Sequence, residues 1–68
     1  MSEWTCERDP STGDIACSRG LPKVMNRPPL TVRSRDGEDS SDAAKREARA
    51  FFATREGLNF TEVGVVVS

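Results

Sequence analysis

The sequence contains no histidine and no tyrosine, and only two cysteines among its 68 residues. Without histidine it lacks the side chain that most often serves as a general base or binds a metal ion near neutral pH. It also shows no Gly-x-Ser-x-Gly elbow and no glycine-rich phosphate loop. We therefore predict no catalytic residues, no metal site and no cofactor, and we expect that the protein is not an enzyme.

Long apolar stretches are absent as well. No segment approaches the ~20 apolar residues that cross a membrane, and the start, Met-Ser-Glu-Trp-Thr-Cys-Glu, lacks the basic and apolar regions of a signal peptide. We expect a cytoplasmic protein that does not associate with membranes. A chain of 68 residues makes one small domain, residues 1–68, whose core is thin. A larger protein partner or a homo-oligomer would help to complete that core.

Neither sign of charge dominates, because ten basic and eleven acidic residues give a net charge of −1. The charges come in blocks: residues 15–35 hold five basic and no acidic residues, whereas residues 36–42 hold four acids and no base. The blocks alternate along the chain. No continuous basic stripe of the kind that favours nucleic acid is present.

Residues 1–19 have the pattern of a β-hairpin. Two short segments, residues 4–8 and 15–19, flank the sequence Asp-Pro-Ser-Thr-Gly-Asp, in which proline, glycine and aspartate all favour a turn. We predict that Arg8 pairs with Ile15.

In that register Cys6 falls opposite Cys17, and the pair has two interpretations. A disulfide across the hairpin would be worth about 3 kcal/mol through loop closure. In a reducing cytosol the two residues would instead be small buried thiols. The sequence favours the thiols, because two cysteines are too few to indicate a secreted disulfide scaffold.

Residues 20–29 contain three prolines, which exclude a helix and disfavour a central strand. We predict an extended crossing segment between the hairpin and the rest of the chain. Leu21, Val24 and Met25 are expected to attach it to the core.

Residues 30–67 have the pattern of a strand–helix–strand unit. Residues 30–35 alternate between apolar and polar, as a half-buried strand does. Residues 41–56 predict an amphipathic helix that ends at Gly57. Its apolar stripe is Ala44, Ala48, Phe51 and Phe52.

The start of that helix has its own signals. Ser40 or Ser41 is expected to cap it. Asp42 and Arg46 are expected to form a favourable pair one turn apart.

Residues 60–67 are rich in β-branched side chains and predict the last strand. With a crossover of about two dozen residues, this strand is expected to pair in parallel with residues 30–35. The predicted fold is a small α+β domain: an N-terminal hairpin plus the strand–helix–strand unit, with one helix packed on one face of a 3–4-stranded sheet.

The last strand is the main candidate for partner binding, through Thr61, Val63, Val65 and Val67. These residues share one face, which we expect to meet the helix, while Gly64 on the other face indicates a bulge or a close approach. If the strand lies at a sheet edge, its unpaired backbone groups invite strand addition by another chain. A central strand with both edges paired fits the valine run equally well.

The basic residues give an alternative surface for nucleic acid: Arg33, Arg35, Lys45, Arg46 and Arg49. The acids between them weaken the attraction for phosphate, and a solvated face is the favoured interpretation. We expect a small non-enzymatic protein-binding module that acts as regulator, inhibitor or accessory subunit of a larger protein. The expectation draws on an analogy of architecture, because many small phage-encoded and bacterial accessory proteins have this size and layout. A nucleic-acid-binding module and a structural subunit of a larger assembly are the alternatives.

Overall fold

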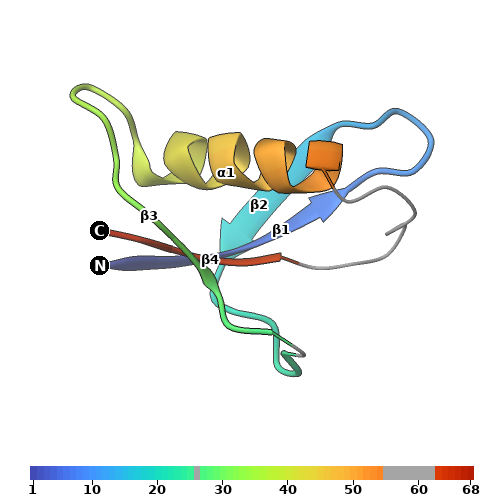
Figure 1. The fold of residues 1–68 in the computed structure, drawn as a ribbon, viewed down its shortest axis with the longest axis horizontal. Coiled ribbons are helices and arrows are strands. Elements are labelled where there is room, and N and C mark those ends of the chain that lie inside the picture. The colour runs from blue at the N-terminus through green and yellow to red at the C-terminus, as the bar shows by residue number, and fades with distance from the viewer. Residues whose placement is uncertain (26, 55–62) are drawn as a thin grey trace.

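The computed structural model describes residues 1–25, 27–54 and 63–68, and in them it shows one helix and four strands (Figure 1). In chain order these are β1 (Ser2–Arg8), β2 (Ile15–Arg19), β3 (Leu30–Val32), α1 (Ser40–Thr54) and β4 (Val63–Val67). The strands form one mixed sheet in the order β2-β1-β4-β3, and α1 covers one face of it. The predicted class, a small α+β domain with one helix on one face of a small sheet, is confirmed.

The hairpin forms in the predicted register. Arg8 pairs with Ile15, and Cys6 pairs with Cys17, in an antiparallel ladder between β1 and β2. β1 is longer than predicted, because its other edge pairs with β4 from Ser2 onward.

Local hydrogen bonds hold the turn of the hairpin. The N–H of Asp9 donates to the carbonyl of Asp14 at 2.8 Å, and the carboxylate of Asp9 accepts from the hydroxyl and the N–H of Ser11. These bonds, chiefly the one from the hydroxyl, favour the charged carboxylate and lower the pKa of Asp9. Gly13 has a φ of 79°, in the left-handed region that glycine enters without steric cost.

β3 pairs with β4 in parallel, as predicted for the strand–helix–strand unit. β4 lies between β3 and β1, so the unit and the hairpin share one sheet. β3 spans only Leu30–Val32 and not the predicted residues 30–35, because its ladder with β4 ends at the pair Val32 and Val67. Beyond it the N–H of Ser34 still donates to the carbonyl of Ser68 at 3.3 Å, and the carbonyl of Arg33 accepts a hydrogen bond from Arg46. Residues 60–62 of the predicted last strand lie outside the described residues.

The helix α1 spans Ser40–Thr54, and its predicted end at residues 56–57 lies outside the described residues. It begins one residue earlier than predicted. The carbonyl of Asp39 accepts the first helical hydrogen bond, from the N–H of Ala43 at 3.0 Å. Asp39 therefore holds the N-cap position, and neither serine does.

The core lies between α1 and the sheet. Alternate residues of β4 face the helix, as predicted, and Val65 is fully buried there. Three residues of the predicted helix stripe are buried, and Phe51 is half-buried. The buried residues of the core are Trp4, Cys6, Val32, Ala43, Ala44, Ala48, Phe52, Val63, Val65 and Val67.

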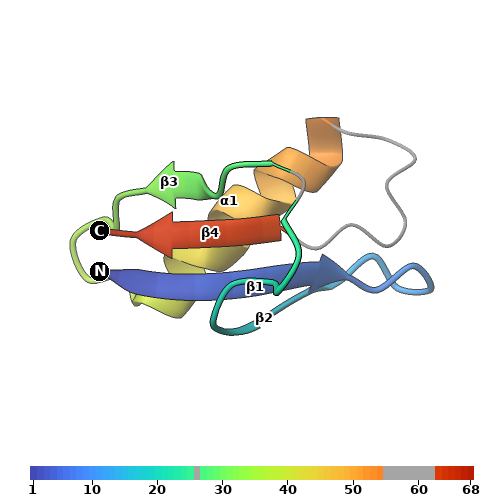
Figure 2. The same ribbon diagram turned by 90° about the horizontal axis from the view of Figure 1, so that it is seen from below.

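The opposite face of the sheet is partly covered by residues 20–25 and 27–29, which lead from β2 across β1 and β4 to β3 (Figure 2). Gly64 of β4 lies directly beneath this segment. A Cβ added to Gly64 would come within 2.8 Å of Met25 Cε and 3.3 Å of Leu21 Cδ2. The predicted close approach at Gly64 is confirmed, and Leu21 and Met25 attach the segment, whereas Val24 is 80% exposed.

Candidate functional site

β4, the strand predicted to offer a binding surface, is paired on both of its edges, with β1 and with β3. Val63, Val65 and Val67 are buried under α1, and Thr61 lies outside the described residues. A strand that is paired on both edges offers no backbone groups to another chain. The interpretation of β4 as a binding edge is therefore wrong: its valines serve the core.

The strands at the two edges of the sheet are β2 and β3. At the end of the β1–β2 ladder, the N–H of Gly20 donates to the carbonyl of Glu3 at 2.9 Å. Glu3 and Gly20 are therefore a hydrogen-bonded pair of the ladder. Such pairs alternate along an antiparallel ladder, so every second residue of β2 directs its N–H and C=O away from β1. These outward residues are Ile15, Cys17 and Arg19. Among the described residues, no strand pairs with them.

We call the outward backbone groups of Ile15, Cys17 and Arg19 the β2 edge. It runs along a strand of five residues, against three in β3. Proteins often protect a sheet edge with charged side chains or proline. β2 contains no proline, and its one charged residue, Arg19, stands at its end.

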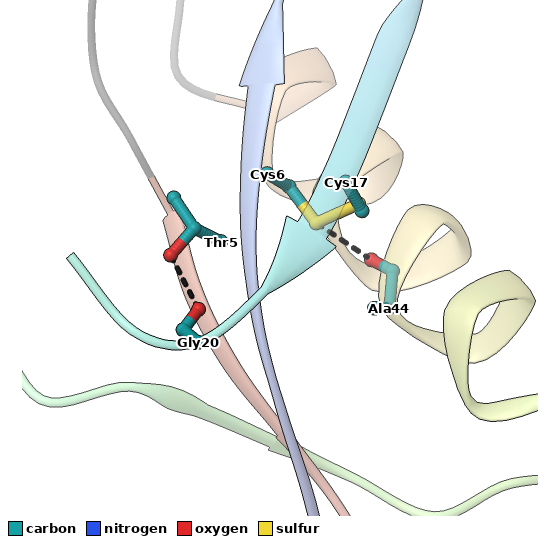
Figure 3. The surroundings of a disulfide bond; sticks show 5 residues. All are labelled: Thr5, Cys6, Cys17, Gly20 and Ala44. Carbon is teal, nitrogen blue, oxygen red and sulfur yellow. Dashed lines mark hydrogen bonds between the residues drawn. A yellow bond between two sulfur atoms is a disulfide. The ribbon is translucent and has the colours of Figure 1, made fainter.

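A disulfide joins Cys6 of β1 to Cys17 of β2 (Figure 3), where the sequence favoured two thiols. The two Cα atoms are 4.1 Å apart, as expected for the closely spaced pairs of an antiparallel ladder that do not exchange backbone hydrogen bonds. Cys6 Sγ lies 3.8 Å from the carbonyl oxygen of Ala44. A disulfide sulfur carries no proton, so this is a packing contact between the hairpin and α1.

At the other edge of the sheet, a side chain of α1 already binds the backbone just after β3. Nη2 of Arg46 donates to the carbonyl of Arg33 at 3.2 Å, and Nε and Nη2 of Arg46 donate to the Glu38 carboxylate at 3.0 Å each. These bonds, helped by one from the N–H of Arg35, lower the pKa of Glu38 to about 2. The same contact raises the pKa of Arg46. Arg46 pairs with Glu38 and not with Asp42, its predicted partner, because the loop folds back over the helix.

The five basic residues of the alternative nucleic-acid surface do not act as one set. The guanidinium of Arg46 is held by Glu38, and Arg33 and Arg35 follow β3 instead of sharing a strand face. Lys45 and Arg49 belong to α1, where Arg49 is exposed. An acid therefore lies among these cations, and it weakens any attraction for phosphate.

Arginine side chains lie over the aromatic rings of the helix. The guanidinium of Arg8, in β1, is 5.4 Å from the ring centre of Phe52, and that of Arg27 is 4.9 Å from the ring centre of Phe51. Phe52 therefore faces the hairpin, and Phe51 faces the segment just before β3. These two contacts define which flank of α1 lies over which part of the sheet.

The same kind of contact occurs at the end of β2. The guanidinium of Arg19 lies 5.2 Å from the ring centre of Trp4, whose side chain is buried in the core. Within the described residues, the indole N–H of Trp4 has no hydrogen-bond partner. A cation over the face of tryptophan is the most favourable arrangement of this type.

In the part of the chain that the structure describes, no three side chains of the metal-binding types come together. No helix described there is long and apolar enough to cross a membrane. Comparisons with protein-family models, with curated proteins and with solved structures find no match. No relative therefore points to a function, and the β2 edge remains the candidate site.

The sequence predicted Ile15, Cys17 and Arg19 as strand residues but not as a binding edge. One signal was present: the strand is followed at once by Gly20 and Pro22, which take the chain out of the sheet. A strand with a proline-rich segment next to it has no sequence neighbour to pair with its second edge.

Proposed function

We propose that the protein is a small protein-binding module that adds an extended segment of a larger protein to its sheet at the β2 edge. The observation that supports this is the outward direction of the N–H and C=O groups of Ile15, Cys17 and Arg19. In strand addition, backbone hydrogen bonds supply affinity and alternate side chains supply selectivity. A module of this kind would act as regulator, inhibitor or accessory subunit of the larger protein.

The β2 edge is held in place before any partner arrives. The disulfide ties Cys17 to β1, and the hydroxyl of Thr5 donates to the carbonyl of Gly20 at the end of β2 (Figure 3). A strand that is already ordered loses little conformational freedom on binding. The added segment then bears most of the ordering cost.

A cytoplasmic site of action, the expectation from the sequence, would expose the disulfide to cellular thiols. β2 would then stay on β1 through its backbone hydrogen bonds and the bond from Thr5. We propose that the module binds most tightly with the disulfide formed, because the edge is then best ordered.

Amide hydrogen exchange, followed by NMR, tests strand addition. In the free protein the N–H groups of Ala16 and Ser18 should exchange slowly and those of the β2 edge quickly, because only the former bond to β1. The probe is a blocked seven-residue peptide of alternating valine and threonine.

At millimolar peptide, the amides of Ile15, Cys17 and Arg19 should gain protection, while that of Thr31 on β3 should not change. If the three β2-edge amides exchange as quickly with the peptide as without it, the proposed function is wrong. Equal protection of Thr31 would show non-specific association and would also count against it.

A further inference from the structure

Four cations lie on the helix side of the hairpin, next to the β2 edge. Arg19 belongs to β2 itself, and the others come from β1 and α1. Within the described residues none of the four forms a salt bridge, since the one present there joins Arg46 to Glu38. We call them the hairpin-side cations: Arg8, Arg19, Lys45 and Arg49.

The orientation of α1 places two of them there. Phe52 faces the hairpin, where it contacts Arg8, and Phe51 faces the segment before β3. Lys45 and Arg49 precede Phe52 by seven and three residues, and helical side chains at these spacings lie on the same side of a helix. Both cations therefore belong to the flank of α1 that borders the hairpin. Asp42 lies three residues before Lys45 and seven before Arg49, so this flank also carries one acid, and its net charge is positive.

Arg19 is the cation closest to the β2 edge. Its guanidinium lies over the ring of Trp4, and no side-chain hydrogen bond of Arg19 occurs in the described part of the chain. A planar guanidinium with free N–H groups is suited to bind a carboxylate through two hydrogen bonds. Arg19 is thus positioned to bind an acidic side chain on a neighbouring strand.

The other side of the sheet has a different character. There β2 presents the small exposed side chains of Ala16 and Ser18, and β1 presents the exposed acids Glu3 and Glu7. An added strand alternates its side chains between the two sides of the sheet. It would meet cations on the helix side and small or acidic groups on the other.

We infer that the segment added at the β2 edge is acidic on one face, with aspartate or glutamate at alternate positions directed toward α1 and uncharged residues between them. This inference rests on the proposed function. A second copy of this chain fits less well, because pairing β2 with its own copy would place both sets of hairpin-side cations along the same side of the joined sheet.

Three blocked seven-residue peptides test the inference, with valine alternating with glutamate, threonine or lysine. Binding is measured by titration calorimetry and located by the NMR shifts of the β2 amides. We expect the glutamate peptide to bind at least about tenfold more tightly than the lysine peptide at low salt, with the difference shrinking as salt screens the charges.

Two variants with the same change in net charge locate the effect. Arg19→Glu should weaken binding of the glutamate peptide about tenfold, since it replaces an attraction by a repulsion. Arg33→Glu, beyond the end of β3, should leave it within about twofold. Binding of the glutamate peptide to Lys45→Glu tests the cations of the helix flank separately from Arg19. Thermal melts confirm that each variant is folded.

The outcomes separate the two proposals. If all three peptides bind the β2 edge equally, or if Arg33→Glu weakens binding as much as Arg19→Glu, the acidic preference is wrong while strand addition stands. If no peptide shifts the β2 amides, strand addition itself is wrong and the inference fails with it. Shifts of the β2 amides that grow with protein concentration alone would make a second copy the occupant and overturn the inference.

Discussion

Reduction of the Cys6–Cys17 disulfide should strongly destabilise the domain. The two residues are 11 apart in sequence, and loop-closure theory gives about 3 kcal/mol for a loop of this size. At about 0.05–0.15 kcal/mol per residue, a chain of 68 residues has a free energy of unfolding of roughly 3–10 kcal/mol. The disulfide therefore supplies about a third of that stability or more.

The loss should come from the unfolded chain and not from the core. Reduction converts Cys6 to a thiol, and its S–H can donate a hydrogen bond to the carbonyl oxygen of Ala44, 3.8 Å from the sulfur. Reduction therefore leaves the Cys6 thiol with a hydrogen-bond partner, and we expect the reduced native state to keep its packing. With a shift of about 4–8 °C per kcal/mol for domains of this size, the melting temperature should fall by roughly 12–24 °C.

Thermal melts followed by circular dichroism, with and without a phosphine reductant, measure this shift, and mass spectrometry confirms the oxidation state. A C6A/C17A variant is the matched control, because its melt should not respond to reductant. A fall of less than about 5 °C in the wild-type protein would refute the loop-closure argument, since it corresponds to about 1 kcal/mol or less. A variant that responds to reductant would show that the effect does not arise from the disulfide.

Three further predictions follow from single contacts. Gly64→Ala should cost about 1 kcal/mol or less in urea unfolding, because the new Cβ would meet Met25 Cε at 2.8 Å and this terminal methyl group can move aside; adding Met25→Ala should recover part of this loss, and additive effects would contradict the contact. Glu38→Gln should lower the urea midpoint above pH 4.5, the ordinary pKa, and the difference from wild type should vanish as pH falls toward 2, because a lowered pKa stabilises the fold only while the carboxylate is charged. A difference between the two urea midpoints that does not change with pH would rule out a stabilising role for the charged Glu38 carboxylate. Val65→Lys should abolish the cooperative thermal melt, because it buries an unpaired charge in the core, and a melt near the wild-type temperature would contradict the central position of β4.

Much of the fold follows from local patterns. Turn residues between two short alternating segments set the hairpin register, and with it the pairing of Cys6 and Cys17. The apolar stripe of the helix and the alternation in β4 identified the sides that meet in the core. Gly64 marked the place where residues 21–25 approach the sheet. Each of these signals depends on residues close together in sequence.

The end of β3 and the partner of Arg46 could not be predicted from local patterns. β3 pairs with β4 only as far as Val32, and the carbonyl of Arg33 just beyond it accepts a hydrogen bond from Arg46 of the following helix. Arg46 is drawn to Glu38 rather than to Asp42 by the path of the intervening loop. Both outcomes depend on contacts of α1 or β4 with the segment between β3 and α1, and local sequence patterns do not report such contacts.

The amino-acid pattern was enough to predict which side of each strand is buried, because side-chain periodicity reports burial. It did not determine which edge of each strand is paired, because the edges are made of backbone groups that are the same for nearly every residue. Only the tertiary structure placed β4 in the centre and left β2 at an edge. The disulfide also appears only in the tertiary structure, since the turn residues predicted the register of Cys6 and Cys17 but not the bond between them. The candidate site is therefore the outward backbone of Ile15, Cys17 and Arg19 and not the valines of β4.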